Sequence, residues 1–246
     1  MELRVRVLTT NEDLHRVPPL EQSIWGNPDP IPDSLLRVMA DHGGGVWVAT
    51  PADVPETWLG FAVALPGCDG TGWYLHSHLA GVVASRRRQG IGLALKLHQR
   101  QWARARGYSR ICWTFDPLRA ANAHFNLVRL GVRVVEYRVD YYGTLNSTLN
   151  RALPTDRLLV EWPTEPAAVD SVMVDHDEPP AFIPIPPDLD AVMIQDPAGA
   201  DAWLRSVRAK FHRCLMAGYV VTGFDRNASP PRYILRKGSH SPQLSD

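Results

Sequence analysis

Apolar and polar residues alternate in several short runs of this chain, and alternation is the pattern of a strand with one buried face. The first run spans Leu3 to Leu8. The runs at residues 46–50 and 58–65 are separated by a turn that contains two prolines, which predicts a hairpin. Similar runs predict further strands at residues 73–83, 110–115, 132–142, 219–224 and 232–235.

Other stretches repeat their apolar residues every three or four positions, which indicates amphipathic helices. The clearest stretch runs from Ile91 to Ala105, and Gly107 occupies the position of a helix-ending glycine. Thr10 followed by Asp13 resembles a helix-opening cap, and the dipeptide 18–19, Pro-Pro, interrupts the helix that follows. Further helices are predicted at residues 33–41, 120–130 and 201–217.

Charge is unevenly distributed, although the 26 basic and 26 acidic residues cancel. Residues 81–140 carry 12 Lys or Arg against 3 Asp or Glu, whereas residues 155–190 carry 9 acidic residues and one Arg. Seven prolines fall between residues 163 and 187, and proline lacks the N–H group that helices and sheets use. The sequence therefore predicts three parts: a domain over residues 1–152, a proline-rich acidic connector over 153–197, and a small C-terminal helix and hairpin with a frayed tail over 198–246.

The composition is that of a folded, globular protein, with 45% hydrophobic and 21% charged residues among 246. A net charge of zero argues against a protein held to nucleic acid or to a membrane surface by charge. Three cysteines form neither a disulfide framework nor a metal knuckle, and no metal site is predicted. The N-terminus lacks the apolar core of a signal peptide, and no run is long enough to span a membrane, so we expect a cytoplasmic location.

The most informative segment is the loop from Arg86 to Gly92, between a predicted strand and a predicted helix. The first N–H groups of a helix have no internal partner and carry the positive end of its dipole, so they favour an anion. Gly90 and Gly92 leave the backbone open to a phosphate, and three arginines at 86–88 add cationic side chains. The loop lacks the Gly-Lys-Ser/Thr ending of a P-loop and the third glycine of a dinucleotide fingerprint. It indicates a phosphorylated ligand, with a basic surface loop as the alternative.

The run Arg87-Arg88-Gln89-Gly90-Ile91-Gly92 resembles the Arg-x-x-Gly-x-Gly loop of the GNAT acyltransferase superfamily. As in that family, it follows a strand, here ending Gly81-Val82-Val83, and precedes an amphipathic helix; the resemblance covers roughly residues 3–145. It implies a mixed α/β fold with a twisted, mostly antiparallel central sheet flanked by helices, and acetyl-CoA or succinyl-CoA as cofactor. The cofactor-binding residues that it implies are Val82, Val83, Arg87, Arg88, Gln89, Gly90, Ile91, Gly92, Leu93, Ala94, Asn122 and Asn126.

More of the chain resembles a narrower group of GNAT-like proteins. The shared motifs are His-Ser-His-x-x-Gly-Val at 76–82, Trp-Thr-Phe-Asp-Pro-Leu at 113–118, Asn-Ala-x-Phe-Asn at 122–126, Tyr-Tyr-Gly at 141–143 and Asp-Arg at 156–157. Members of that group are associated with N-acylation, notably N-succinylation of D-amino acids in a route that feeds an N-acylamino-acid racemase. The resemblance therefore suggests an amino acid as the acceptor.

Acyl transfer from a thioester to an amine needs a base for the amine, a donor for the developing oxyanion and a proton for the departing thiolate. The resemblance places His78 where many members have a Glu, and an imidazole with a pKa of about 6.5 can serve as the base. His76 would share its face of the strand, and a structural role for both remains the alternative. Leu127 stands where the family has its thiolate-protonating Tyr, so Tyr141, Tyr142 or water are the candidate acids.

The acceptor pocket of GNAT folds usually lies against the first helices. Glu21, Trp25 and the turn at residues 28–32 occupy that region here, although Trp25 could serve packing and Glu21 could be a solvated helix residue. The carboxylate of an amino-acid acceptor would need a cation, and Arg138 and Arg157 are the candidates.

The predicted function is the transfer of an acetyl or succinyl group from acyl-CoA to the amine of a small molecule, with a homodimer as the suggested assembly. One alternative is a non-catalytic acyl-CoA sensor or interaction module, which the missing Tyr and the replacement of Glu by His favour. A second alternative is that the basic region contacts nucleic acid; the acidic connector and the lack of a recognisable nucleic-acid module argue against it.

Overall fold

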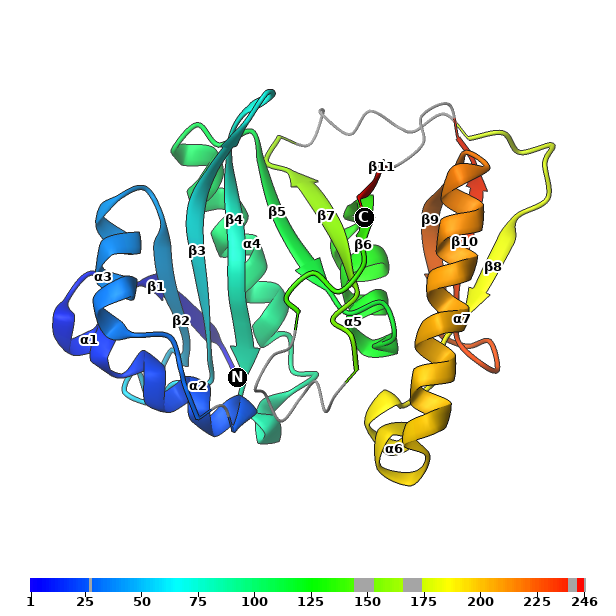
Figure 1. Cartoon of the computed structure of the whole chain (residues 1–246). Coiled ribbons are helices and arrows are strands. Elements are labelled where there is room, and N and C mark those ends of the chain that lie inside the picture. The colour runs from blue at the N-terminus through cyan, green and yellow to red at the C-terminus, as the bar shows by residue number, and fades with distance from the viewer. Residues whose placement is uncertain (27, 144–152, 166–173, 239–242, 246) are drawn as a thin grey trace. The chain divides into compact units, whose positions relative to one another are not determined.

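The computed structural model describes residues 1–26, 28–143, 153–165, 174–238 and 243–245 (Figure 1). These residues divide into two compact units. The first comprises 1–113 and 163–165, and the second comprises 114–143, 153–162, 174–238 and 243–245. Residue 152, the predicted domain boundary, and residues 166–173 of the predicted connector lie outside the described residues. In the described part of the chain, none of the helices has both the length and the hydropathy that crossing a bilayer requires.

The first unit is built on a sheet whose strand order follows the chain. Its strands are β1 (Leu3–Val7), β2 (Gly45–Pro51), β3 (Gly60–Asp69), β4 (Gly72–Val82) and β5 (Arg110–Phe115), which leaves the unit after Trp113. Neighbouring strands are antiparallel except β4 and β5, which are parallel. The sequence predicted all five strands, with ends displaced by a few residues.

Three short helices cover one face of this sheet: α1 (Asn11–His15), α2 (Val17–Trp25) and α3 (Asp33–Asp41). Thr10 caps α1 as predicted, because its hydroxyl accepts a hydrogen bond from the amide of Asp13 at 3.2 Å. The Pro-Pro pair begins α2, where a missing N–H is tolerated, so the predicted interruption separates two helices.

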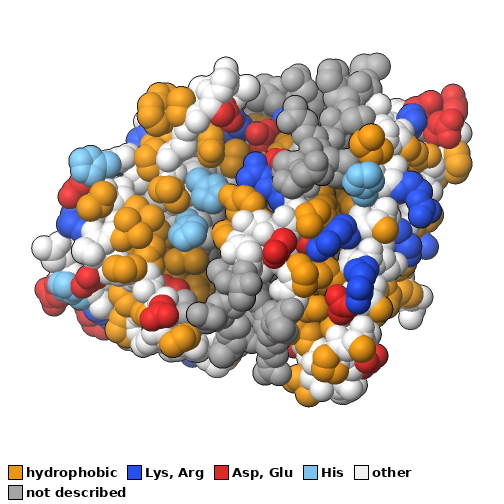
Figure 2. All heavy atoms as spheres, in the orientation of Figure 1, with side chains coloured by type: hydrophobic (Ala, Val, Ile, Leu, Met, Phe, Trp, Pro, Cys, Tyr) orange, Lys and Arg blue, Asp and Glu red, His pale blue; other side chains and the backbone are white. Residues whose placement is uncertain are grey.

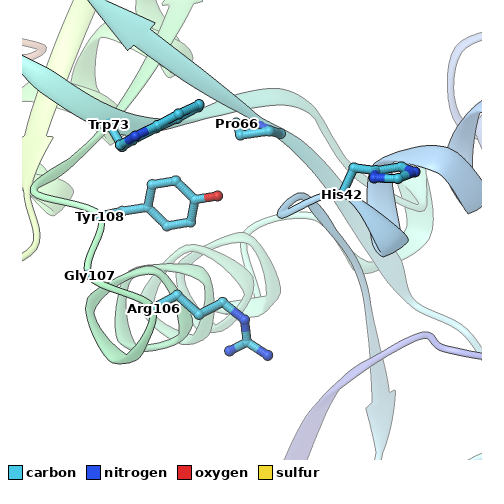
Figure 3. Close-up of a pocket in the computed structure, with 6 residues that line it drawn as sticks. All are labelled: His42, Pro66, Trp73, Arg106, Gly107 and Tyr108. Carbon is cyan, nitrogen blue, oxygen red and sulfur yellow. The ribbon is translucent and has the colours of Figure 1, made fainter.

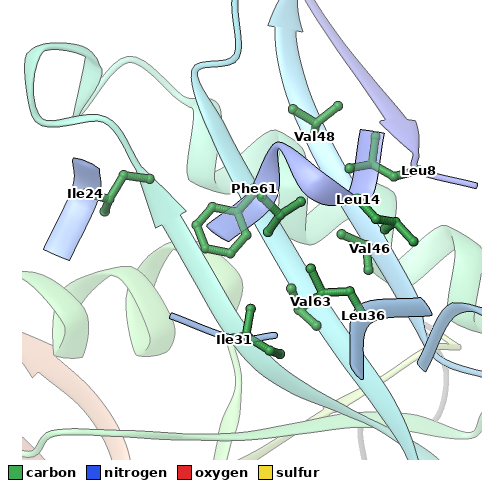
Figure 4. Packing of buried hydrophobic residues seen from close by; sticks show 10 residues of the cluster. Leu8, Leu14, Ile24, Ile31, Leu36, Val46, Val48, Phe61 and Val63 are labelled. Atoms are coloured by element: carbon green, nitrogen blue, oxygen red, sulfur yellow. The ribbon is translucent and has the colours of Figure 1, made fainter. Parts of the chain in front are cut away.

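Apolar burial holds these helices to the sheet (Figure 4). Every member of the cluster is at most 8% exposed, and burying one such side chain is worth about 1.5–3 kcal/mol. The cluster comprises Leu8, Leu14, Val17, Ile24, Ile31, Leu36, Val46, Val48, Phe61 and Val63. The helices that carry Glu21 and Trp25 are therefore fixed against the strands.

A longer helix, α4 (Ile91–Ala105), covers the opposite face, and a single 3₁₀ turn, η1 (Ala84–Arg86), precedes it. Trp47 alternates along β2 with residues of the first cluster, so its ring points to this second face. There it meets Trp102 of α4 edge to face, with ring centroids 5.1 Å apart. The helix that starts at the glycine loop is thus anchored in the core by its far end.

An extra residue interrupts the pairing of β4 with β3. Ser77 pairs with Ala64 and Leu79 pairs with Val63, so His78 between them is the additional residue of a β-bulge. A bulge changes which face the following side chains occupy. The candidate base therefore lies at an irregular point of the strand.

The two faces of β4 show this change directly. Ser77 accepts a hydrogen bond from Lys96 of α4, so it points to the α4 face. A Cβ built on Gly81 would lie 2.9 Å from the ring of Trp25 of α2, so this position points to the other face. In a regular strand, residues four apart would share one face.

β4 also separates early from β5. The parallel register contains only two pairs, Leu75 with Ile111 and His76 with Cys112. Beyond His76, the β5-facing edge of β4 has no strand partner among the described residues of the first unit. Backbone groups on such an edge are available to an extended ligand.

The described strands of the second unit form two sets of paired strands. In the first, β6 (Arg133–Arg138) lies between antiparallel β7 (Arg157–Pro163) and parallel β11 (Gln243–Ser245). The second has the order β8 (Ala181–Pro184), β10 (Arg232–Lys237) and β9 (Tyr219–Asp225), all antiparallel. The predicted C-terminal hairpin is therefore confirmed as β9 and β10, with β8 added at its edge.

Four helical segments complete the second unit. They are α5 (Ala120–His124), a π-helical turn η2 (Phe125–Leu130), α6 (Leu189–Gln195) and α7 (Pro197–Met216). Gly131 ends the π-helical turn at φ 68°, as the sequence predicted for the helix stop. Helix α7 buries Leu204, Val207 and Phe211, and Figure 2 shows Lys and Arg side chains along the same helix.

Two secondary-structure expectations were wrong. The predicted connector contains β7, β8 and α6, and the predicted frayed tail contains β11. Prolines misled the prediction, because Pro163 and Pro184 each end a strand, where the missing N–H breaks no ladder. Arg157–Pro163 also alternates between buried and half-buried positions, a pattern that the acidic composition concealed.

Candidate active site

The glycine loop has the backbone geometry that its glycines predicted. Gly90 is the residue that opens α4, in the left-handed region at φ 84°, and Arg88 is also left-handed at φ 64°. A Cβ added to Gly90 would meet nothing within 4 Å, so glycine is needed there for conformation and not for packing. The turn brings residues 87–94 together as predicted, and Ile91 turns its side chain into the core.

The open end of α4 suits a negatively charged ligand. No side chain caps the helix and no acidic residue occupies its first turn, so the first amides of α4 keep their unpaired dipole end. Arg86, Arg87 and Arg88 are all exposed beside it. The Nε of Arg87 donates to the carbonyl of Val82 at 3.4 Å, which ties the arginine loop to the end of β4. These residues fit the diphosphate of an acyl-CoA.

The two valines at the end of β4 differ in their free backbone groups. The amide of Val83 donates to Leu59 at 3.0 Å, and its carbonyl accepts from the amide of Arg86 at 2.9 Å. Val82 is the last residue of β4 and has Gly60 opposite it on β3. Both backbone groups of Val83 therefore bond within the protein. From His76 to Val82, one edge of β4 pairs with β3, and the other edge faces away from β3.

His78 lies on the bulge, exposed, with its ring centroid 6.3 Å from that of His76. Partial burial by the surrounding protein lowers the pKa of His78 below its ordinary value, while the charge of Glu21 acts in the opposite direction. A histidine with a lowered pKa is neutral at pH 7 and can accept a proton. The rings of the two histidines therefore lie near each other, although the bulge makes the strand irregular between them.

Glu21 and Trp25 of α2 lie against the same strand. Glu21 is only 3% exposed, and its Oε2 accepts a hydrogen bond from the amide of Ile31 at 3.0 Å, which fixes the turn before α3. Trp25 packs edge to face on Phe61 at 5.5 Å and covers Gly81. The first unit therefore assembles the predicted base and the predicted acceptor-side residues around one face of β4.

Sequence reasoning missed Lys96, which is buried on the other face. Its Nζ donates to the hydroxyl of Ser77 at 2.8 Å and lies 3.7 Å from the ring centroid of Trp113. Ser77 and Trp113 are the first residues after β4 and β5 stop pairing, so Lys96 lies at the fork between the strands. Burial lowers the pKa of Lys96 to about 7. The only sequence signal was that Lys96 directly follows Leu95 of the apolar stripe, and polar Gln99, which is also buried, lies on the same face of α4.

The remaining predicted residues belong to the second unit. Asn122 is exposed on α5, whereas Asn126 is buried in the π-helical turn and its carbonyl accepts a hydrogen bond from Val132 at 3.1 Å. The hydroxyl of Tyr142 lies 3.1 Å from that of Thr114. Arg138 forms an ion pair with Glu136 at 2.8 Å.

A separate open pocket of about 370 Å³ lies at the far end of α4 (Figure 3). It includes Arg106, just past the helix, so it is about 20 Å of helix away from Gly90. Its side chains serve packing: Arg106 stacks on Trp102 at 3.8 Å, and the hydroxyl of Tyr108 donates to the carbonyl of Gly43 at 2.6 Å. We therefore place the candidate site at the glycine loop and β4.

No family model matches the sequence, and no curated protein matches it. Several solved structures, in contrast, are similar to this chain in fold. The ribosomal-protein-S18-alanine N-acetyltransferase of Escherichia coli is 19% identical with a TM-score of 0.53, over 70% of this chain and 100% of that chain. NAA60 of Arabidopsis thaliana, solved with acetyl-CoA, is 17% identical with a TM-score of 0.53, over 66% and 99%. An N-acetyltransferase of Staphylococcus aureus Mu50 is 16% identical with a TM-score of 0.52, over 67% and 100%.

These similarities establish the fold. The chain has the mixed α/β fold of GNAT acetyltransferases, with a mostly antiparallel sheet flanked by helices, as the resemblance implied.

The coupling between Glu21 and His78 gives the first prediction. Glu21→Gln removes the charge that raises the pKa of His78 but keeps an oxygen for the amide of Ile31, so the pKa of His78 should fall further. NMR titration of the His78 ring measures it. His98 of α4, whose pKa is lowered by burial alone, should titrate as before; an unchanged or raised His78 pKa would refute the coupling.

Lys96 gives the second prediction, on stability. Its pKa is about 7 in the folded protein against 10.5 for the free side chain, so between these values the unfolded chain holds more protons than the folded one. The free energy of unfolding of the wild type should therefore rise with pH relative to Lys96→Met, by up to about 1.4 kcal/mol per pH unit from pH 7 to 10. Urea unfolding at several pH values tests this, with Lys210→Met as the control. A difference that stays flat would show that Lys96 keeps its charge.

Proposed function

We propose that this protein is an acyl-CoA-dependent N-acyltransferase that acetylates or succinylates the amine of a small molecule. The observation that carries the proposal is the start of α4 at left-handed Gly90, which has no side-chain cap and lies beside exposed arginines. It follows β4, which pairs with β5 over two residue pairs before the strands separate. The similar solved structures support it, since they are N-acetyltransferases, and that of NAA60 holds acetyl-CoA.

The loop supplies the binding part of the proposal. The amides of residues 88–94 and the forks of Arg87 and Arg88 would hold the diphosphate, and the open edge of β4 would pair with the extended pantetheine arm. When bound, the cofactor supplies an acyl group activated as a thioester. Asn122 and Asn126 stay candidates for further contacts with the arm.

The chemistry would rest on the groups along β4. His78, neutral at pH 7, would take the proton from the attacking ammonium or amine, and the charge of Glu21 would stabilise the imidazolium that forms. His76 would hold a water or a second hydrogen bond beside it. Tyr142 remains the candidate for returning a proton to the thiolate, since the family position holds Leu127.

A second candidate function is an acyl-CoA-binding module without turnover. Leu127 in place of the acid favours it, because that side chain can transfer no proton. For either function we propose the cytoplasm as the location. The three cysteines, none of which forms a disulfide in the part of the chain that the structure describes, suit a reducing compartment.

Binding of acetyl-CoA by the full chain, measured by isothermal titration, is the first test. Gly90→Ala strains the left-handed turn that orients the first amides of α4, so acetyl-CoA affinity should fall at least about tenfold, the value of one charge-assisted hydrogen bond. Gly107→Ala is a matched control, because Gly107 is also left-handed, at φ 78°, with open space around it, after the other end of α4. No heat with the wild type, or equal loss in both variants, would remove the proposal.

Turnover separates the enzyme from the binding module. Release of free thiol from acetyl-CoA and succinyl-CoA should be measured against a panel of D- and L-amino acids and simple amines. His78→Ala should lower kcat about 100-fold while acetyl-CoA affinity stays unchanged; His98→Ala should leave kcat near the wild-type value. Wild-type rates in His78→Ala from pH 6 to 9 would exclude His78 as the base. Binding without thiol release for any amine would favour the module.

A further inference from the structure

The first unit buries a lysine without a carboxylate partner. Lys96 is 5% exposed, and among the described residues it forms no ion pair with an Asp or Glu. Lysines are almost never fully buried unless they are paired, because an isolated charge is costly to remove from water. The groups proposed above for acyl transfer do not include Lys96, so its position calls for another explanation.

The contacts of Lys96 leave part of its ammonium group unused. Its Nζ donates to the hydroxyl of Ser77 at 2.8 Å and lies 3.7 Å from the ring centroid of Trp113, whose face attracts a cation. An ammonium group has three N–H donors, and one hydroxyl and one ring occupy at most two of them. Lys96 can therefore donate to one further acceptor.

The pKa of Lys96 is lowered to about 7 by burial alone. An amine with this pKa carries its proton in about half of the molecules at pH 7, so it can give the proton up and regain it. No neighbouring charge contributes to the shift. Of the strands packed against α4, β2 carries no charged side chain, and Arg6 of β1 and Asp69 of β3 are paired with other charged residues. The titratable residues of the elements that meet at the fork are His76 and His78 of β4, Arg110 and Cys112 of β5, and His98 and Arg100 of α4.

The length of β4 brings the sulfur end of a bound pantetheine arm to Lys96. In the proposed function the diphosphate lies at the loop after Val82, and the arm runs back along the open edge of β4. The arm is about as long as four extended residues, roughly 14 Å, and the strand from Val82 to Ser77 covers about 16 Å. Ser77 and Trp113 are the first residues beyond the last pair between β4 and β5. The sulfur would therefore arrive at the fork that holds Lys96.

His78 and Lys96 approach this edge from opposite faces of the sheet. The pKa of His78 responds to Glu21 of α2, and α2 and α4 cover opposite faces (Figure 1). Ser77, which receives the hydrogen bond from Lys96, points to the α4 face. A base on one face and a proton donor on the other can act on the amine and on the sulfur separately.

We propose that Lys96 donates the proton that the sulfur of CoA takes up as its bond to the acyl carbon breaks. The inference rests on the proposed function and gives it an acid within the first unit, since the family position holds Leu127. The amine nitrogen forms the new bond to the acyl carbon, and the electron pair of the carbon–sulfur bond goes to the sulfur. Lys96 passes one proton to that sulfur, becomes a neutral amine and regains a proton from solvent. His78 releases to solvent the proton that it took from the amine.

The first test needs no turnover. CoA, which has a free thiol, is bound to the full chain, and the ultraviolet absorbance of its thiolate is followed against pH, with the complex of desulfo-CoA, the analogue without the sulfur, as the blank. A cation close to the sulfur favours the thiolate, so the absorbance should appear at least about one pH unit lower in the wild type than in Lys96→Met. Lys210→Met should match the wild type. Desulfo-CoA should bind the wild type and Lys96→Met with equal affinity.

The outcomes separate this inference from the proposed function. Equal titrations of bound CoA in the wild type and Lys96→Met would overturn the inference and leave the proposed function standing. Loss of desulfo-CoA affinity in Lys96→Met would show that Lys96 only holds the fork together, which also contradicts the inference. A wild type that binds neither CoA nor acetyl-CoA would remove the proposed function, and the inference with it.

Turnover gives the second arm. With the donor and amine that the wild type uses, kcat should fall above about pH 7 as Lys96 loses its proton. Lys96→Met should lower kcat about 100-fold at pH 7 and remove this fall. Ser77→Ala breaks the same hydrogen bond but keeps the amine, so it should keep the fall and lower kcat less than about tenfold. Equal losses in the two variants, or a fall that Tyr142→Phe removes and Lys96→Met does not, would contradict the proposal.

Discussion

The early separation of β4 from β5 is the constraint on which the candidate site depends. Parallel strands in a buried sheet normally pair along their whole length, because unpaired backbone groups are costly. Here two residue pairs join these strands, and no described strand of the first unit pairs with the rest of that edge of β4. The uncapped start of α4, the His78 bulge and Lys96 are all arranged along that open edge or at its base.

Helix α4 gives this edge its chemical character. Its first amides and the preceding arginines make one end electropositive, while Trp102 near the other end is locked against Trp47. Between them Lys96 is held among apolar atoms, where a charged amine is disfavoured. One helix thus presents a polar end for a ligand, a titrating group within the core and a rigid apolar anchor.

Much of the first unit could be predicted from sequence because its signals are local. Alternation gave the strands, the glycines gave the loop, and Thr10 gave the helix cap. The rest depended on contacts between distant residues. Nothing local to β4 indicates that Glu21 acts on His78 or that Ser77 receives Lys96. The acidic, proline-rich stretch misled because its strands are recognised by pairing, and the pairing of Arg157 with Arg138 joins positions 19 residues apart.

The bulge at His78 also sets the geometry of β4 independently of the side chain at that position. The extra residue places Ser77 and Gly81 on opposite faces of the strand. The number of residues between them sets this arrangement, whatever side chain occupies position 78. An imidazole can therefore replace a carboxylate at this position without repacking either layer. Loss or gain of a single residue between Ser77 and Gly81, in contrast, would move one of these two positions to the other face, so that either the contact with Lys96 or the contact with Trp25 would be lost. Position 78 is consequently more tolerant of substitution than this part of the strand is of insertion or deletion.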